Sequence, residues 1–247
     1  MNKVALVTGS ARGIGRQIAI TLAKAGYDII INYNTSKDKA YLLKDEIENL
    51  GDKCIVIKCD ISNELEVKEM VTTILKEFKK VDVLVNNAAV CFDSLFQDKS
   101  AENFMRTMEV NVLGTFLVSK YIGQIMYDNK YGKIINLTST NGINTYFPMC
   151  IDYDASKSAI ISLTHNLAMQ FAPYVNVNAI APGFISTESE VSGMDKEFIE
   201  AEVEKIMVKR IGTEEDVANL VEFLASDKAN FINNEIIRID GGIYGNV

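Results

Sequence analysis

The stretch TGSARGIGRQ, Thr8 to Gln17, separates two contrasting patterns. The apolar run VALV before it predicts a short buried strand, and IAITLAKAG after it has the periodicity of a helix. A glycine-rich turn between a strand and a helix aims backbone N–H groups and the positive helix end at a phosphate. The spacing G-x-x-x-G-x-G differs from the G-x-G-x-x-G dinucleotide fingerprint, so tight strand-to-helix packing is the competing interpretation.

Outward from this turn, β-rich runs alternate with helical patterns. Such alternation predicts an α/β fold with a doubly wound, parallel sheet and helices on both faces. With three prolines and no linker or repeat, residues 1–247 are expected to form a single domain. A long helix is expected at about 153–171, and the seven strands are expected near 3–8, 28–33, 53–59, 81–87, 133–139, 175–180 and 235–240.

The charge balance argues against nucleic acid as a partner. The chain carries 25 Lys and Arg against 33 Asp and Glu, a formal net charge of −8, whereas phosphate backbones attract a basic surplus. Although 48% of the residues are apolar, no run reaches the roughly 18 residues that a membrane helix needs. We therefore expect a soluble, cytoplasmic protein, with neither nucleic acid nor membrane as a partner.

Cysteine and histidine give no sign of a metal or hydrolytic site. The four cysteines, Cys54, Cys59, Cys91 and Cys150, lack paired metal spacing, so we expect free thiols, no metal and no disulfide. The only histidine, His165, lies in the helical run SAIISLTHNLAMQF, which favours a helix-face residue over a catalytic base. A Ser-His-Asp hydrolase is therefore disfavoured.

Tyr153 and Lys157 are four positions apart in an expected helix, so their side chains should share one face. A nearby ammonium favours the phenolate form of a tyrosine, so this pair can exchange a proton with a bound substrate near neutral pH. Ser139 ends an expected strand, at the sheet edge where open α/β folds bind ligands, and its hydroxyl can bond a substrate oxygen. The alternative for Tyr153 and Lys157 is an ordinary surface pair.

Further motifs follow in order: Asn86-Asn87-Ala88-Ala89, Asn111, Ser139, Tyr153-x-x-x-Lys157 and Pro182-Gly183. Together with TGSARGIG they resemble the short-chain dehydrogenase/reductase family over essentially the whole chain. The ending RIGTEEDVANLVEFLASDKANFINNEIIRIDGG resembles the bacterial 3-oxoacyl-[acyl-carrier-protein] reductase branch. The resemblance implies a Rossmann-type fold with strand order 3-2-1-4-5-6-7, a cofactor-binding part at about 1–130 and a catalytic part at about 131–247.

The resemblance also implies hydride transfer between a nicotinamide cofactor and a carbonyl or alcohol carbon. The family's catalytic set corresponds to Asn111, Ser139, Tyr153 and Lys157, in which Tyr153 moves the proton and Asn111 holds a water beside the lysine. From the residues alone, Asn111 is also consistent with a buried core amide. The implied cofactor contacts are Gly9, Ser10, Arg12, Gly13, Ile14, Gly15, Asn34, Asp60, Ile61, Asn87, Ala88, Tyr153, Lys157, Pro182, Gly183, Ile185 and Thr187.

Some of these positions have plainer interpretations. Asp60 precedes a helical run and has the chemistry of a helix cap, and asparagines such as Asn87 are common turn formers. Two residues depart from the family pattern, since Ala89 and Asn234 stand where glycine is usual or common. One extra position between the catalytic serine and tyrosine predicts that the loop 141–152 bulges and shapes its own pocket.

The residues after the second expected strand favour NADP(H), with NAD(H) possible. NAD-selective sites place an acid about 20 residues beyond the glycine turn, whereas this strand ends in Tyr33-Asn34. Lys37 and Lys39 follow closely, and the resemblance places Arg12 on the 2′-phosphate of NADP(H). The competing interpretation is that these three cations are solvated surface charges.

The substrate has no readable code in the sequence. We favour a 3-oxoacyl thioester or a related small ketone; the alternatives are a sugar, steroid or other alcohol dehydrogenase, and a non-catalytic dinucleotide sensor. By resemblance, we expect a homotetramer formed through helices near 101–129 and 153–171 and the C-terminal segment. Acyl carrier protein is expected to be a poor partner. Its acidic surface would need a cluster of Lys and Arg beside the site of this chain, and the sequence offers only Lys130 and Lys133 as the beginning of one.

Overall fold

The computed structural model describes residues 2–144, 146–187 and 195–243. Its main sheet has seven parallel strands in the order β3-β2-β1-β4-β5-β6-β9. Since β9 is the seventh strand of this sheet along the chain, the predicted fold and strand order are confirmed. The strands are β1 (Lys3–Val7), β2 (Tyr27–Tyr33), β3 (Cys54–Lys58), β4 (Val83–Asn86), β5 (Gly132–Leu137), β6 (Val175–Pro182) and β9 (Ile236–Ile239).

A second, two-stranded sheet pairs β7 (Ile185–Ser186) with β8 (Gly212–Thr213). The sequence analysis did not predict it, because strands of two residues carry no measurable periodicity. This pair joins the loop after β6 to the residues that begin the last long helix. Residues 188–194, which follow β7 in the sequence, lie outside the described part of the chain.

Helices connect the strands, and the one expected at 153–171 begins two residues earlier. Within the described ranges, no helix combines the length and apolar character needed to cross a membrane. The helices are α1 (Gly13–Lys24), α2 (Lys37–Asn49), α3 (Glu64–Phe78), α4 (Ala101–Met108), α5 (Thr115–Asp128), α6 (Ile151–Phe171), α8 (Lys196–Lys205) and α9 (Glu214–Ala225). Shorter turns are η1 (Phe96–Asp98), the π-helical η2 (Glu109–Gly114), η3 (Thr140–Gly142) and η4 (Asp227–Ala229).

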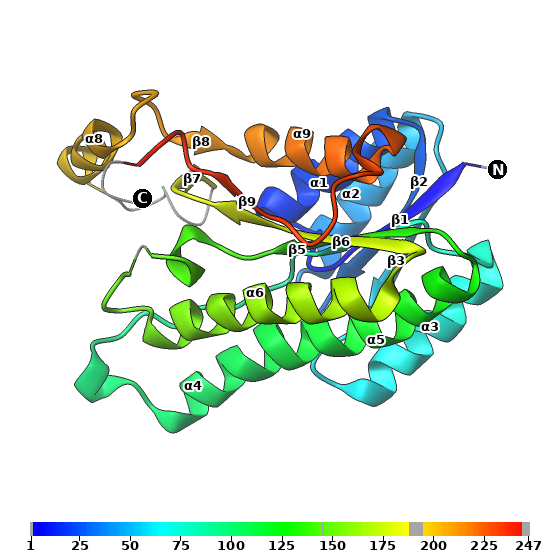
Figure 1. Cartoon of the computed structure of the whole chain (residues 1–247), viewed down its shortest axis with the longest axis horizontal. Coiled ribbons are helices and arrows are strands. Elements are labelled where there is room, and N and C mark those ends of the chain that lie inside the picture. The colour runs from blue at the N-terminus through cyan, green and yellow to red at the C-terminus, as the bar shows by residue number, and fades with distance from the viewer. Residues whose placement is uncertain (1, 145, 188–194, 244–247) are drawn as a thin grey trace.

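Two apolar cores cover the two faces of the sheet. Ala5 and Val7 of β1 pack with residues of α1, α2 and α9, whereas Val4 and Leu6 pack with residues of α3, α5 and α6. Figure 1 shows these two groups of helices on opposite sides of the sheet. The alternation follows from the strand period of two, which sends successive side chains to opposite faces.

Because all seven strands run parallel, their carboxyl ends share one edge of the sheet. The segments that leave β1, β4, β5 and β6 at this edge begin at Thr8, Asn87, Thr138 and Gly183. Open α/β sheets bind ligands at this edge, next to the point where the strand order reverses. Here the chain turns from β1 to β2 on one side and places β4 on the other, so the glycine turn lies at the reversal.

Candidate active site

The glycine turn leaves the start of α1 open toward solvent. Gly9 and Gly13 have φ of +62° and +59°, a backbone region that strongly favours glycine. Arg12 is the N-cap residue of α1 and makes no side-chain cap bond, and the first helical turn contains no acid. The first N–H groups of the helix are therefore available to an anion. The Ser10 hydroxyl is buried and has no hydrogen-bond partner among the described residues, as expected of a group that a bound dinucleotide would satisfy.

Two asparagines hold this turn in place. Asn32 Oδ1 accepts a hydrogen bond from the Gly9 N–H at 3.1 Å, and Asn87 Nδ2 donates to the carbonyls of Thr8 and Gly9 at 2.9 and 3.2 Å. A Cβ on Gly15 would lie 2.4 Å from Asn87 Nδ2, so the third glycine is needed for this close approach. Sequence reasoning missed Asn32, although a polar residue inside the apolar strand DIIINY was a usable signal.

Asp60 is the centre of a polar cluster beyond β3. Its carboxylate pairs with Arg106 at 2.6 Å, and it accepts hydrogen bonds from Ser62 and from Asn34. Burial alone would raise the pKa of Asp60, but the bonds from Ser62 and Arg106 outweigh it and hold that pKa below its ordinary value. The cap of α3 is Asn63, so the helix-cap interpretation of Asp60 was wrong.

Tyr153 and Lys157 lie one turn apart on α6, as predicted. The Lys157 ammonium is 5.3 Å from the centre of the Tyr153 ring and donates a 2.7 Å hydrogen bond to the Leu137 carbonyl at the end of β5. Lys157 is only 4% exposed, and this burial lowers its pKa to about 8. The surface-pair interpretation is therefore wrong for Lys157, because a surface lysine keeps its ammonium in water.

The turn after β5 packs directly on this part of α6. Thr138 Oγ1 donates to the Lys157 carbonyl at 2.7 Å, and a Cβ on Gly142 would lie 2.7 Å from the Lys157 carbonyl carbon. Ser139 lies between them, half-buried, with its Oγ accepting a hydrogen bond from Asn141 N at 3.2 Å. The fold thus brings Ser139 to the helix that carries Tyr153 and Lys157, at the carboxyl edge of the sheet.

Asn111 lies in the π-helical turn η2, which interrupts the α4–α5 helix. Its amide is buried and makes three bonds: it accepts from Val90 N at 2.8 Å and donates to Val90 O and Ser156 Oγ at 3.0 Å each. Among the described residues, these bonds link the loop after β4 to α6 and do not reach Lys157. A π-helical turn of this kind is frequent at functional sites.

The remaining predicted contacts lie near the same edge. Ala88 donates its N–H to Thr8 Oγ1 at 3.1 Å, and Ile61 packs against Gly114 in the core. Ile14, in the first turn of α1, packs against the other core. Pro182 ends β6, and Gly183 leads from it to Ile185 and Thr187, which are buried.

The two departures from the family pattern have different backbone consequences. Ala89 is exposed and does not have a positive φ, so alanine is accommodated there. Asn234 has φ of +67° and therefore occupies a position that favours glycine or asparagine. Its side chain forms a 2.6 Å hydrogen bond with His165 Nδ1. His165, the only histidine of the sequence, lies on α6 about three helical turns beyond Tyr153. A catalytic role for His165 receives no support.

A buried ion pair supports the start of α6 and was missed by the sequence analysis. Asp152 is fully buried, pairs with Lys99 at 2.8 Å and accepts a 2.6 Å hydrogen bond from Thr107. Lys99 also donates to the Phe92 carbonyl. The pair therefore ties the loop after β4 to the residue next to Tyr153. Its members are 53 positions apart, so no local pattern reveals it.

We expect Asp152→Asn to lower the free energy of unfolding by about 3–5 kcal/mol, because it leaves a buried ammonium without its counter-charge. Urea denaturation at neutral pH measures this change. The double variant Lys99→Met/Asp152→Leu is the control, since it removes both charges and should recover most of the loss. A loss below about 1 kcal/mol in the single variant would show that the pair behaves as a solvated one.

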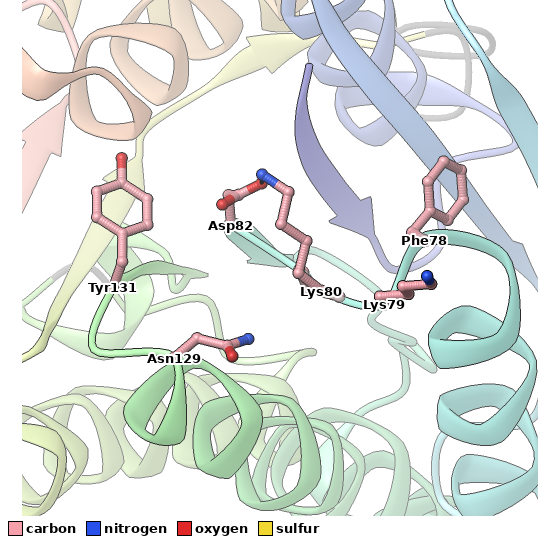
Figure 2. A pocket seen from close by; sticks show the side chains of 7 residues that line it. Phe78, Lys79, Lys80, Asp82, Asn129 and Tyr131 are labelled. Carbon is pink, nitrogen blue, oxygen red and sulfur yellow. Dashed lines mark ion pairs between the residues drawn. The ribbon is translucent and has the colours of Figure 1, made fainter. Parts of the chain in front are cut away.

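A hollow of about 340 Å³ lies at the opposite edge of the sheet, before β4 and β5 (Figure 2). Its position at the amino ends of the strands separates it from the candidate site. Near this edge, Lys133 is buried and donates to Asn176 and Asn230 at 2.8 and 2.7 Å. The suggestion that Lys130 and Lys133 begin a basic patch beside the site was therefore wrong. The hollow is lined by Phe78, Lys79, Lys80, Val81, Asp82, Asn129 and Tyr131.

An open glycine turn at a helix start and a Tyr-Lys-Ser group at the carboxyl edge of one parallel sheet are the features expected of a dinucleotide-dependent oxidoreductase. The family model described as enoyl-(acyl carrier protein) reductase matches residues 9–244. The chain belongs to the short-chain dehydrogenase/reductase family. It is accordingly an NAD(P)-dependent enzyme that acts on small-molecule substrates.

Known relatives extend over nearly the whole chain. The 3-oxoacyl-[acyl-carrier-protein] reductase FabG of Staphylococcus epidermidis is 39% identical over 99% of this chain and 100% of its own. A gluconate 5-dehydrogenase from Burkholderia cenocepacia, solved with NADP and tartrate, has a TM-score of 0.91 at 28% identity and covers 98% of this chain and 95% of its own. A short-chain dehydrogenase from the same species, solved with NADP, has a TM-score of 0.90 at 30% identity, with 97% of each chain covered.

Proposed function

We propose that this enzyme uses NADPH to reduce a 3-oxoacyl thioester or a related small ketone. The observation that carries the proposal is the full-length similarity to relatives that are named 3-oxoacyl-[acyl-carrier-protein] reductases, at 36–39% identity. The buried lysine beside Tyr153 and the open glycine turn supply the chemistry that such a reaction needs.

In the proposed reaction, Tyr153 gives its phenolic proton to the carbonyl oxygen, and the Ser139 hydroxyl donates a hydrogen bond to the same oxygen. The Lys157 ammonium stabilises the resulting phenolate and binds ribose hydroxyls of the cofactor. Asn111 fixes the Val90 loop against α6 and holds a water of the proton relay. The bound nicotinamide supplies the hydride.

The proposed cofactor contacts occupy the ends of successive strands. The turn after β1 binds the phosphates, residues near β2 and β3 bind the adenosine, and the segments after β4 and β6 bind the ribose and the nicotinamide. In that order the residues are Gly9, Ser10, Arg12, Gly13, Ile14 and Gly15; Asn34, Asp60 and Ile61; Asn87 and Ala88; and Pro182, Gly183, Ile185 and Thr187.

Cofactor preference should depend on Arg12, which is exposed at the start of α1. We expect Arg12→Ala to raise the Michaelis constant for NADPH about 10- to 100-fold, because a charge-assisted bond to the 2′-phosphate is lost. The constant for NADH should change little. Initial rates at varied cofactor concentration measure both. Arg16→Ala is the matched control, since Arg16 lies on the same helix and pairs with Glu46; equal effects of Arg12→Ala on both cofactors would contradict the assignment.

The proposed substrate class is tested against a second candidate. Because a structural neighbour is a gluconate 5-dehydrogenase, oxidation of gluconate with NADP⁺ is the rival activity. We would compare it with reduction of an acetoacetyl thioester by NADPH, following nicotinamide absorbance with the same purified protein. A higher kcat/KM for gluconate would overturn the proposed substrate. Cofactor binding without turnover of any tested ketone, sugar or steroid would instead favour a non-catalytic dinucleotide sensor.

We also propose a homotetramer, formed through α4, α5 and α6. Large apolar side chains are exposed on these helices, among them Met105, Phe116 and Met169, and Leu113 is exposed in the intervening η2. In Figure 1, α5 and α6 lie side by side on one face of the molecule. A contiguous group of such side chains would be typical of an association surface. Part of the C-terminal segment invoked in the sequence analysis, residues 244–247, lies outside the described residues.

Light scattering at micromolar concentration should give four times the 27.4 kDa chain mass. Phe116→Glu should reduce this mass, because a carboxylate in an apolar interface loses its hydration. Leu42→Glu, at an exposed apolar residue of α2 on the other face of the sheet, is the matched control and should leave the mass unchanged. A monomer mass for the unmodified protein would refute the tetramer.

A further inference from the structure

Two cysteines and an aspartate meet beside the candidate active site. Cys91 and Asp93 lie in the loop after β4, and Cys150 is the residue immediately before α6. The sulfurs are 3.3 Å apart, and each lies 3.1 Å from the same oxygen, Asp93 Oδ1. The three potential ligand atoms therefore form a small, nearly equilateral triangle.

The cluster is open to solution on one side. Cys91 and Asp93 are exposed, whereas Cys150 is 8% exposed and closes the inner side. The hydrogen bond with Cys91, the burial and the hydrogen bond with Asp93 raise the pKa of Cys150. A cation can reach the triangle from the solvent side, where Cys91 and Asp93 are exposed, and bind by displacing the thiol protons.

We propose that Cys91, Asp93 and Cys150 bind one thiophilic divalent cation of the Zn²⁺ type. Thiolate and carboxylate ligands match the preferences of zinc, and three protein ligands leave a fourth position open to water. Zinc bonds are about 2.3 Å to sulfur and about 2.1 Å to oxygen, which places tetrahedral sulfurs about 3.8 Å apart. The two sulfurs need to separate by only about half an ångström to accept the ion.

The position of Asp93 favours a cation over a disulfide as the purpose of this cluster. A disulfide forms by attack of a thiolate, and a carboxylate 3.1 Å from both sulfurs opposes the formation of that anion. The same negative charge attracts a metal ion and contributes a third ligand. Oxidation of the thiol pair is consequently the rival outcome in the test below.

A bound ion would join two segments that the candidate site uses. Val90, next to Cys91, bonds the Asn111 amide, and Cys150 precedes Tyr153 by three residues. Stapling the loop after β4 to the start of α6 should restrict substrate access and lower turnover. This effect on turnover rests on the proposed function, whereas ion binding does not.

The test uses Co²⁺ as a spectroscopic probe on the reduced, full-length protein, followed by competition with Zn²⁺. We expect one Co²⁺ per chain, a sulfur-to-cobalt charge-transfer absorption in the near ultraviolet, and loss of that absorption when Zn²⁺ is added. Cys91→Ser and Cys150→Ser should abolish the band. Asp93→Asn removes the charge of a direct ligand. It should weaken binding by more than about tenfold, because removal of an outer-shell partner already costs about 10- to 100-fold in metal affinity.

Cys54→Ala is the matched control, because Cys54 is a buried cysteine of β3 and belongs to no part of the cluster. It should keep the cobalt band and its intensity. A band that persists in Cys91→Ser or disappears in Cys54→Ala would overturn the assignment. The absence of a cobalt band in the reduced protein would also overturn the assignment. In that case, a chain mass that is two hydrogens lower before reduction would identify a disulfide. Mg²⁺ should not compete, since it prefers oxygen ligands.

Discussion

Tyr153→Phe should lower kcat about 1,000-fold and leave the dissociation constant of the cofactor nearly unchanged. The substitution removes only the hydroxyl that is proposed to give the proton, and general acid catalysis typically contributes 10²–10⁴-fold. The ring remains, so its contact with the Lys157 ammonium is kept. Steady-state rates and fluorescence titration of the reduced cofactor measure the two quantities separately.

Tyr41→Phe is the matched control for this prediction. Tyr41 lies on α2 with its side chain exposed, on the other face of the sheet from α6. Its loss of a hydroxyl should change neither rate nor binding. If Tyr153→Phe retained a tenth or more of the original kcat, the proton would have another source and the role of Tyr153 would be wrong.

Lys157→Met should lower kcat about 100- to 1,000-fold and weaken cofactor binding as well. Methionine keeps most of the side-chain volume but removes the ammonium that is proposed to stabilise the phenolate and to bind ribose hydroxyls. Because burial lowers the pKa of Lys157 to about 8, kcat/KM of the original enzyme should also fall above about pH 8. An unchanged cofactor dissociation constant with lost activity would restrict Lys157 to the electrostatic role.

The same substitution should stabilise the cofactor-free fold at pH 7. The folded pKa of Lys157, about 8, lies below the ordinary value of 10.5, so between these values the unfolded chain binds more protons and stability rises with pH. Below pH 8 the full cost of the buried ammonium is present, about 3 kcal/mol. Methionine removes that cost but loses the bond to the Leu137 carbonyl, about 1 kcal/mol, which leaves a gain of about 2 kcal/mol.

Urea denaturation of the cofactor-free protein at pH 7 and at pH 10 tests this gain. The advantage of Lys157→Met should shrink toward pH 10, where the buried lysine of the original protein is neutral. A variant that is less stable at pH 7 would show that the ammonium is better compensated than its burial suggests. A variant that gains stability and loses activity is the pattern expected of an active site that keeps a costly buried charge.

Local patterns in the sequence determined the fold class, the glycine turn and the placement of Ser139, Tyr153 and Lys157, whereas the other candidate site residues were expected from the family resemblance. The alternation of strand and helix periods predicted the seven-stranded sheet, which the structure confirms. Tyr153 and Lys157 were placed on one helical face by their spacing alone, and the positive φ of Gly9 and Gly13 matches the turn that TGSARGIG predicted. These features depend on residues that are close along the chain, so their periodicity carries the information.

Contacts between distant segments were decided only by the tertiary structure. Asn32 reaches the glycine turn from β2, Lys99 meets Asp152, and Cys91 meets Cys150, over sequence separations of 23, 53 and 59 residues. Lys133, which the sequence suggested as a surface charge, is buried because β5 lies inside the sheet. The composition of a short segment does not specify which segment packs against it, because that choice depends on strand order and on the helices that cover each face.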